Sequence, residues 1–201
     1  MTEVKGEVRP IFPAGAVVRY RNPAHQEIAI DDFAWFRNYG SLTRSTSQEK
    51  NILDEPRFHD LRAFLETCVR DYLDNVYAYE YDAFHIVHAW LNRAPEGGYQ
   101  RMHFHGNSVV SGVYYLRADP KRSAPLMFEK PEVNASPYIA IAARRQTIFT
   151  ANRVAYPSET GICYLFPSQI KHGYETPSRG GERISLAFNV MLSGIGLFYK
   201  L

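Results

Sequence analysis

The sequence has few cysteines and no long hydrophobic run. Cys68 and Cys163 are its two cysteines, and each lies in an apolar pattern, where a buried free thiol behaves as a small hydrophobic side chain. A reducing compartment is therefore the simpler expectation. No stretch approaches the roughly 18 consecutive apolar residues that span a bilayer, and the N-terminus lacks an apolar segment with a cleavage site. We expect a cytoplasmic protein without a membrane segment.

The sequence also has little excess charge. Lysine and arginine number 23 against 21 aspartate and glutamate residues, a formal charge of +2. Nucleic-acid binding normally needs a concentrated basic face, so no nucleic-acid partner is expected. The signatures of phosphate loops, nucleophile elbows and CxxC redox sites are absent. Aromatic residues are abundant, with 14 Tyr and 12 Phe among 201 residues. A chain of this length can close one hydrophobic core without disulfides.

The hydrophobic pattern predicts one helix followed by a series of strands. Between Pro56 and Tyr79 apolar residues recur at three- and four-residue spacing, with Asp54 as a candidate cap. Beyond this helix the period changes to two, and turn residues separate the segments. The predicted strands are 84–92, the segment around His-Phe-His, 109–118, 124–129, 161–167 and 183–192. Earlier in the chain, 14–20 is predicted as a strand and 30–39 as a short helix or turn.

Short strands without alternating helices favour a sandwich, a jelly roll or a small barrel. We expect a single domain, 1–201, in which residues 1–80 support a barrel core at 84–192. Residues 119–160 interrupt the strand pattern, and such insertions are often functional loops. A substrate lid and a solvated excursion with one or two extra strands both remain open for this insertion. Its scattered basic residues are Lys121, Arg122, Arg144, Arg145 and Arg153.

Three histidines form the most informative pattern in the chain. His103 and His105 are separated by one residue, which places both side chains on one face if the segment is a strand. His172 follows 67 residues after His105. Imidazole suits Fe, Zn, Cu and Ni, and three protein ligands leave coordination positions free for a substrate. The pattern predicts a catalytic metal site.

The predicted strand at 183–192 places a cation on one of its faces. Side chains alternate along a strand, so if the apolar residues of this one pack into the core, Arg183 lies on the opposite face and is directed into a cavity. A buried guanidinium is costly unless an anion pairs with it. Its fork matches a carboxylate, and Ser185 can donate a second hydrogen bond. The alternative is a surface arginine paired with Glu175 or Glu182. The residues that share the face are Arg183, Ser185, Ala187 and Asn189.

These motifs resemble those of iron(II)/2-oxoglutarate oxygenases found in bacteria and phages. The similar segments are HAWLNRAPEGGYQRMHFHGNSVVSGVYYL, from His88 to Leu116, and GICYLFPSQIKHGYETPSRGGERISLAFN, from Gly161 to Asn189. The family pattern runs W-x-N, a glycine-led turn, H-x-H, S-G-x-Y-Y, F-P-S, a histidine and E-R-x-S-x-x-F-N. The resemblance covers the C-terminal half or more of the chain.

The resemblance implies a double-stranded β-helix, a jelly-roll or cupin-like barrel that is mainly β with one packing helix. It also implies Fe(II) at the open end of the barrel. In the wider superfamily the ligands are H-x-D or H-x-E and a distal histidine, and a later arginine holds the far carboxylate of 2-oxoglutarate. His103, His172 and Arg183-Ile-Ser185 match, but His105 stands where the carboxylate is usual. Compared with the usual set of two histidines and one carboxylate, three neutral imidazoles leave the metal site more positive by one charge unit. The dianionic 2-oxoglutarate can compensate this charge.

Glu129 is a rival third ligand, and in that arrangement His105 supports the ligands without touching the metal. Related sequences carry F-x-D-P here, whereas this chain has Phe-Glu-Lys-Pro with Lys130 at the Asp position. The Tyr115 hydroxyl is a candidate contact to the oxoacid. The residues on rungs that can line the cavity are Trp90, Asn92 and Tyr115.

The expected function is an Fe(II)- and 2-oxoglutarate-dependent dioxygenase that uses O2 to hydroxylate a small-molecule or peptide substrate, with release of succinate and CO2. One alternative is a cupin-type metalloenzyme whose three histidines hold a metal that needs no oxoacid. Another is a non-catalytic barrel that binds a metal or ligand. The prime substrate and the oligomeric state do not follow from the sequence.

Overall fold

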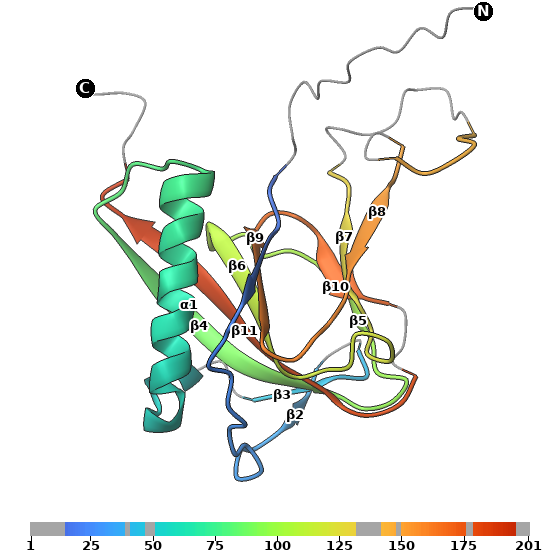
Figure 1. Cartoon of the computed structure of the whole chain (residues 1–201), viewed down its shortest axis with the longest axis horizontal. Helices are drawn as coiled ribbons and strands as arrows, with labels where there is room; N and C mark the ends of the chain where they lie inside the picture. Colours follow the sequence, from blue (N-terminus) through green and yellow to red (C-terminus); the bar gives the residue numbers. More distant parts are fainter. Residues whose placement is uncertain are drawn as a thin grey trace, which may run out of the picture.

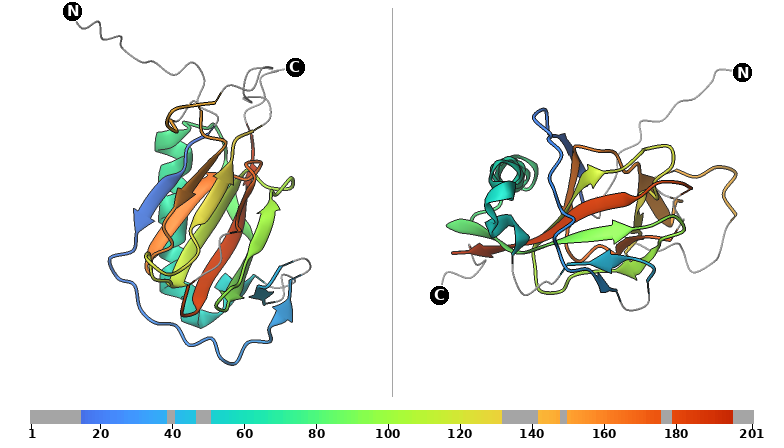
Figure 2. Two further views of the ribbon diagram at one scale, coloured as in Figure 1. Left: turned by 90° about the vertical axis from the view of Figure 1, so that its right-hand side faces the viewer. Right: turned by 90° about the horizontal axis from the view of Figure 1, so that it is seen from below.

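The computed structural model describes residues 15–38, 41–46, 51–131, 142–147, 150–175 and 179–195. Two layers of strands face each other, and a single helix covers the outer face of the larger layer (Figure 1, Figure 2). Every strand pair in the described residues is antiparallel. The mainly β barrel with one packing helix that the sequence predicts is therefore confirmed.

The larger sheet has seven strands in the order β1-β9-β6-β11-β4-β3-β2, and the smaller has four in the order β5-β10-β7-β8. Strands of the larger sheet are β1 (Val18–Arg21), β2 (Phe36–Arg37), β3 (Arg44–Ser45), β4 (Ala83–Ala94), β6 (Val110–Arg117), β9 (Ile162–Pro167) and β11 (Arg183–Ser193). Strands of the smaller sheet are β5 (Gln100–His103), β7 (Leu126–Glu129), β8 (Arg153–Tyr156) and β10 (His172–Tyr174).

The helical segment lies where the sequence predicts it, but it begins differently. Asp54 does not cap it: this residue ends a 3-10 turn that Asn51 caps, and its carboxylate pairs with Arg62 at 2.6 Å. No helix in the described part of the chain is long and apolar enough to cross a membrane. The successive helical pieces are η1 (Ile52–Asp54), η2 (Pro56–Phe58), α1 (His59–Asp71) and the π turn η3 (Tyr72–Val76).

Two cores flank the larger sheet. On one face, the buried stripe of α1, including Leu65 and Val69, packs with the apolar face of β11. Since side chains alternate along a strand, the other face of β11 is directed toward the smaller sheet, as predicted. Between the sheets lies a second core of Val113, Tyr115, Ala118, Leu126, Phe128, Ile162, Tyr164 and Phe166. The β11 residues of the first core are Ile184, Leu186, Phe188 and Val190.

Several predicted boundaries differ from the observed ones. Residues 30–39, predicted as a short helix or turn, contain a turn at residues 31 and 32 followed by β2. The strand predicted from residue 14 begins at Val18, and Ala14 lies outside the described residues. Within the insertion 119–160 the structure contains β7 and β8. Residues 132–141 and 148–149 of this insertion lie outside the described part, so the lid stays a prediction.

Candidate metal centre

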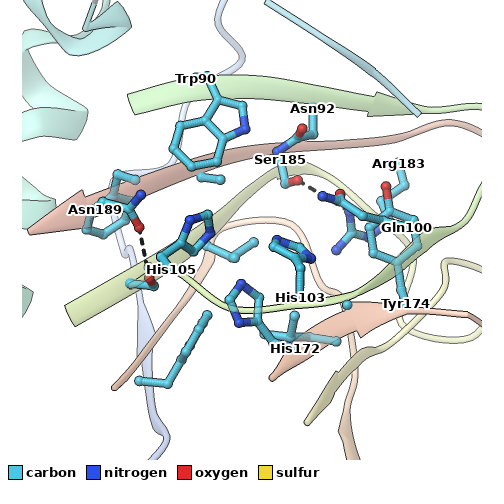
Figure 3. A pocket seen from close by; sticks show the side chains of 18 residues that line it. Trp90, Asn92, Gln100, His103, His105, His172, Tyr174, Arg183, Ser185 and Asn189 are labelled. Carbon is cyan, nitrogen blue, oxygen red and sulfur yellow. Dashed lines mark hydrogen bonds between the residues drawn. The ribbon is translucent and has the colours of Figure 1, made fainter. Parts of the chain in front are cut away.

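His103, His105 and His172 come together at the end of the smaller sheet (Figure 3). Strand pairing brings two of them into contact, because His172 on β10 is the antiparallel partner of His103 on β5. The potential ligand atoms of the three histidines all lie within 4.8 Å of one another. This spacing suits three ligands of a single metal ion.

His105 reaches this group by a route that the sequence did not predict. Strand β5 ends at His103, so His105 does not lie on the next inward rung of a strand, and that expectation was wrong. Instead its backbone N–H donates to the carbonyl oxygen of Ser168 at 2.9 Å, just past the end of β9. Its ring centroid then lies 5.2 Å from that of His103 and 5.4 Å from that of His172.

Backbone carbonyls orient two of the three rings. Nδ1 of His103 lies 2.9 Å from the carbonyl oxygen of Arg101, and Nδ1 of His172 lies 2.9 Å from that of Ile170. A neutral imidazole that donates from Nδ1 keeps its lone pair on Nε2. Both rings can therefore offer Nε2 to a metal, and such carbonyl contacts commonly accompany metal-binding histidines.

Burial keeps two of the imidazoles in the form that binds metals. It lowers the pKa of His172 to about 3 and the pKa of His105 to about 4, and repulsion from a charged His103 contributes less to each shift. Metal ligation requires the neutral imidazole. A set of three neutral nitrogen donors with open positions beside it fits Fe(II).

The rival ligand Glu129 lies at the end of β7, away from this group of nitrogen atoms. Its carboxylate accepts a hydrogen bond from Arg153 at 2.9 Å and lies 3.6 Å from Nζ of Lys171. Glu129 is not among the ligand atoms that converge with the three imidazoles. In this structure it belongs to a surface ion-pair cluster.

Arg183 lies between the sheets with only 2% of its surface exposed. Its Nη2 donates to the Tyr115 hydroxyl at 3.0 Å, and the Tyr174 ring lies 4.1 Å from its Cζ. Two longer contacts of 3.3 Å join Nη1 to Oγ of Ser185 and Nε to Oγ of Ser158. All of these neighbours are electrically neutral.

No carboxylate in the described part of the chain forms an ion pair with Arg183. The two acids weighed as surface partners pair elsewhere, Glu182 with Arg93 and Glu175 with Arg153. A buried cation without an anion is costly. The surroundings of Arg183 therefore fit a ligand that brings a carboxylate, as predicted from the strand pattern.

The imidazoles and Arg183 line one hollow that opens to solvent. Asn92 lines the hollow and accepts a hydrogen bond from Ser45 at 2.6 Å. Trp90 lines it too, with its ring centroid 5.9 Å from that of His105. Tyr115, which was predicted to line the cavity, is fully buried and is not among the residues that line the hollow; its hydroxyl contacts Arg183 instead.

Sequence reasoning missed three residues of this site. Tyr174 had a detectable signal, because it follows His172 by two residues and shares its side of a strand. Gln100 lines the hollow from the start of β5. Ser158 comes from the end of the insertion, and no pattern in the sequence indicates that it reaches Arg183.

Comparisons with known proteins agree with this geometry. A sequence profile described as "Putative 2OG-Fe(II) oxygenase" matches residues 88–189, half of the chain. No curated protein matches. One similar solved structure is an oxidoreductase of the 2OG-Fe(II) oxygenase family from Burkholderia pseudomallei, with 11% identity, a TM-score of 0.57, and coverage of 82% of this chain and 75% of that one.

Two Streptomyces proteins have a similar structure. HygX from Streptomyces hygroscopicus, solved with nickel, 2-oxoglutarate and hygromycin B, is 14% identical with a TM-score of 0.54, covering 80% of this chain and 74% of HygX. AviO1 from Streptomyces viridochromogenes is 15% identical with a TM-score of 0.54, covering 85% of this chain and 77% of AviO1.

At such identities the solved structures establish the fold, which is the double-stranded β-helix expected from the resemblance. The family match spans the segment that contains the three histidines, Arg183 and Ser185. The cofactors of the matched family are Fe(II) and 2-oxoglutarate, as the sequence predicted. The chain therefore belongs to the Fe(II)- and 2-oxoglutarate-dependent oxygenases.

Proposed function

We propose that this oxygenase is a hydroxylase, which inserts one oxygen atom of O2 into a C–H bond of a small-molecule or peptide substrate. The observation that carries the proposal is the group of three imidazoles that shares one hollow with a buried guanidinium, which pairs with no anion among the described residues (Figure 3). When bound together, Fe(II), 2-oxoglutarate and O2 supply the oxidising chemistry, with release of succinate and CO2.

In this proposal His103, His105 and His172 hold Fe(II). The carbonyl contacts of His103 and His172 keep their Nε2 atoms available without any movement of the backbone. Because all three ligands are neutral, the site keeps the full charge of the ion, and a dianionic oxoacid offsets that charge better than a neutral ligand does.

Arg183 and Ser185 would hold the far carboxylate of 2-oxoglutarate. The guanidinium fork suits two parallel hydrogen bonds to a carboxylate. Tyr115 acts on Arg183 rather than on the oxoacid, since its hydroxyl accepts from Nη2 and fixes the plane of the fork. Asn92 lines the same part of the hollow, where its amide can donate to the oxoacid.

Arg183 supports this proposal over the alternative of a three-histidine cupin. An enzyme that uses no oxoacid has no need for a buried cation beside its metal, and such a cation would destabilise the fold. A non-catalytic barrel would bind the same ligands, so turnover separates it from the hydroxylase.

We further propose that residues 1–201 form one oxygenase domain. Strand β1 pairs with β9, and α1 shares a core with β11, so these two N-terminal elements pack against the barrel. This arrangement fits a supporting role for that part of the chain.

The experiment that tests the proposal is anaerobic loading with Fe(II), titration with 2-oxoglutarate by calorimetry, and measurement of succinate after O2 is admitted. We expect one 2-oxoglutarate per iron and slow succinate formation even without substrate. The His172→Ala variant should lose both activities because it lacks a metal ligand. Folded, iron-loaded protein that neither binds 2-oxoglutarate nor forms succinate would contradict the proposal.

A further inference from the structure

Strand β3 lies against the end of the hollow that is proposed to hold the oxoacid, although it precedes the segment 88–189 that the family profile matches. It pairs with β4, and Oγ of Ser45 donates to Oδ1 of Asn92 at 2.6 Å. Two residues earlier, Oγ1 of Thr43 lies 2.6 Å from the hydroxyl of Tyr174. Since Asn92 and Tyr174 both line the hollow, this N-terminal strand supports two residues of the candidate site.

The hydroxyl of Thr43 is fully buried, and the direction of its hydrogen bonds follows from its partners. Its single proton is donated to the carbonyl oxygen of Tyr99 at 3.0 Å, because a carbonyl can only accept. In the contact with Tyr174, Thr43 is therefore the acceptor and the phenol is the donor. The Tyr174 hydroxyl is held by Thr43, and Thr43 is held by the backbone that leads into β5.

The ring of Tyr174 contacts the guanidinium of Arg183. Cζ of Arg183 lies 4.1 Å from the ring centroid, and the two side chains occupy the same end of the site (Figure 3). The attraction between a cation and the face of an aromatic ring is strongest where water is excluded, and Arg183 is almost completely buried. A phenol that donates its proton gains electron density on its ring, which strengthens this attraction.

The ring contact differs in kind from the other contacts of Arg183. Its hydrogen bonds hold the edges of the guanidinium, because the N–H groups lie in its plane. They go to Tyr115, Ser185 and Ser158. The Tyr174 ring adds a contact against Cζ. A cation that is already held in place loses less freedom when its ligand arrives, so the ligand binds more tightly.

We propose that Thr43 is a positioning residue for 2-oxoglutarate: by accepting the hydrogen bond of Tyr174, it keeps the aromatic ring against Arg183 and so raises the affinity of the site for the oxoacid. This inference rests on the proposed function. It extends the oxoacid site to β3, which lies outside the segment that the family profile matches.

The Thr43→Val variant tests the proposal, because it removes the hydroxyl and keeps the shape of the side chain. The carbonyl of Tyr99 still accepts from the backbone of Leu42 at 3.2 Å, whereas the buried phenol of Tyr174 loses its acceptor. By calorimetry on Zn(II)-loaded protein, we expect 2-oxoglutarate to bind at least about fivefold more weakly, with unchanged Zn(II) content. Thr43→Ser restores the acceptor and should bind 2-oxoglutarate within about twofold of the unmodified protein.

Thr46→Val is the matched control in the same segment. Thr46 is also buried, and its Oγ1 accepts from the backbone N–H of Leu91 at 3.0 Å, so its contact is with β4 rather than with Tyr174. This variant should lose a similar amount of thermal stability and keep its affinity for 2-oxoglutarate. Weakening of 2-oxoglutarate by Thr46→Val to the same extent as by Thr43→Val would show general loosening of the segment and overturn the proposal.

Tyr174→Phe separates the hydrogen bond from any other effect of Thr43. In this background the donor is already absent, so Thr43→Val should weaken 2-oxoglutarate by less than about twofold more. A full additional loss would show that Thr43 acts by another route and would overturn the proposal.

The unmodified protein distinguishes the two levels of inference. If it binds 2-oxoglutarate and Thr43→Val binds it equally well, the positioning role of Thr43 fails and the proposed function stands. If the unmodified, Zn(II)-loaded protein does not bind 2-oxoglutarate, the proposed function fails, and the role of Thr43 fails with it.

Discussion

Among the individual residues, Arg183 is the one whose burial is least explained by the protein around it. Hydroxyl groups and aromatic rings surround its guanidinium, and within the described residues none of its contacts is to an anion. A buried guanidinium of this kind indicates where a ligand binds more precisely than any single sequence motif does.

Replacing Arg183 with glutamine should weaken 2-oxoglutarate binding by about 2 to 4 kcal/mol, because the charge and the two-point contact are both lost. Calorimetry on Zn(II)-loaded protein measures this change, and the metal content should stay the same. Arg101→Gln removes an exposed cation from β5 and serves as the matched control. Activity that is insensitive to Arg183→Gln would favour the three-histidine cupin.

The buried imidazoles make the metal-free protein sensitive to acid. An unfolded histidine takes up a proton near pH 6.5, whereas His172 and His105 in the fold resist protonation down to about pH 3 and 4. The unfolded state therefore binds more protons between these limits, so stability is present at pH 7 and falls as the pH drops. From pH 7 to 5 we expect a loss of about 3 kcal/mol in total, of which the more deeply buried His172 contributes about two thirds.

Denaturant unfolding at pH 7, 6 and 5 in the presence of a chelator measures this loss. The His172→Gln variant removes the larger of the two contributions, so its stability should fall only about one third as much across the same range. This window lies above the pKa range of carboxylates, which keeps their titration out of the measurement. An unchanged pH dependence in His172→Gln would show that other groups cause the effect.

Among the elements, the short strand β10 determines whether the metal site forms. It carries His172 between β5 and β7. Its middle residue, Gly173, has no room for a side chain, because a Cβ there would lie 2.8 Å from the carbonyl oxygen of Gln100 and 2.9 Å from that of Arg101. Both atoms belong to the β5 backbone and cannot move aside without displacing His103.

Gly173→Ala should therefore separate His172 from His103, with a cost of about 1 to 3 kcal/mol in stability and a marked loss of metal affinity. Gly106→Ala is the control, since a Cβ at that position meets only the Phe104 ring, at an ordinary 3.8 Å. Thermal unfolding together with metal titration measures both effects. Full metal affinity in Gly173→Ala would show that the close pairing of β10 with β5 is not required.

The sequence predicts long elements better than short ones. The helix and strands such as β4, β6 and β11 repeat their period often enough to be recognised. Strand β10 has three residues, too few for any period, although it carries His172, a proposed metal ligand. The sequence grouped His105 with the other two histidines on the assumption that side chains alternate along a strand. In the structure, a hydrogen bond from the backbone of His105 to Ser168 brings it there instead. Long-range contacts of this kind leave no local pattern.

At the scale of the whole molecule, the side chains of the candidate site come from opposite layers. The imidazoles belong to the smaller sheet and the segment after β5, whereas Arg183 and Asn92 belong to the larger sheet. Residues 84–192 supply all of these groups, as the sequence predicted. Their assignment to two layers was not predictable, because the order of strands in a sheet depends on packing between distant segments.

Because the oxoacid bound to the metal would join the two sheets, metal and 2-oxoglutarate together should stabilise the protein more than the metal alone does. A ligand at one hundred times its dissociation constant adds about 2.7 kcal/mol, which corresponds to about 5 to 10 °C in the midpoint of thermal unfolding for a chain of this size. Scanning calorimetry with Zn(II), with and without 2-oxoglutarate, measures the increment. Arg183→Gln should keep the increment from the metal and lose that from the oxoacid.

This attachment to both sheets has a consequence for the catalytic cycle. In the proposed reaction, the five-carbon acid would contact both Arg183 on the larger sheet and the metal held by the smaller one, whereas the four-carbon succinate that it becomes would be too short to contact both equally well. We expect the contact between the two sheets through the bound acid to be lost after each turnover, so that the product succinate binds more weakly than 2-oxoglutarate and dissociates.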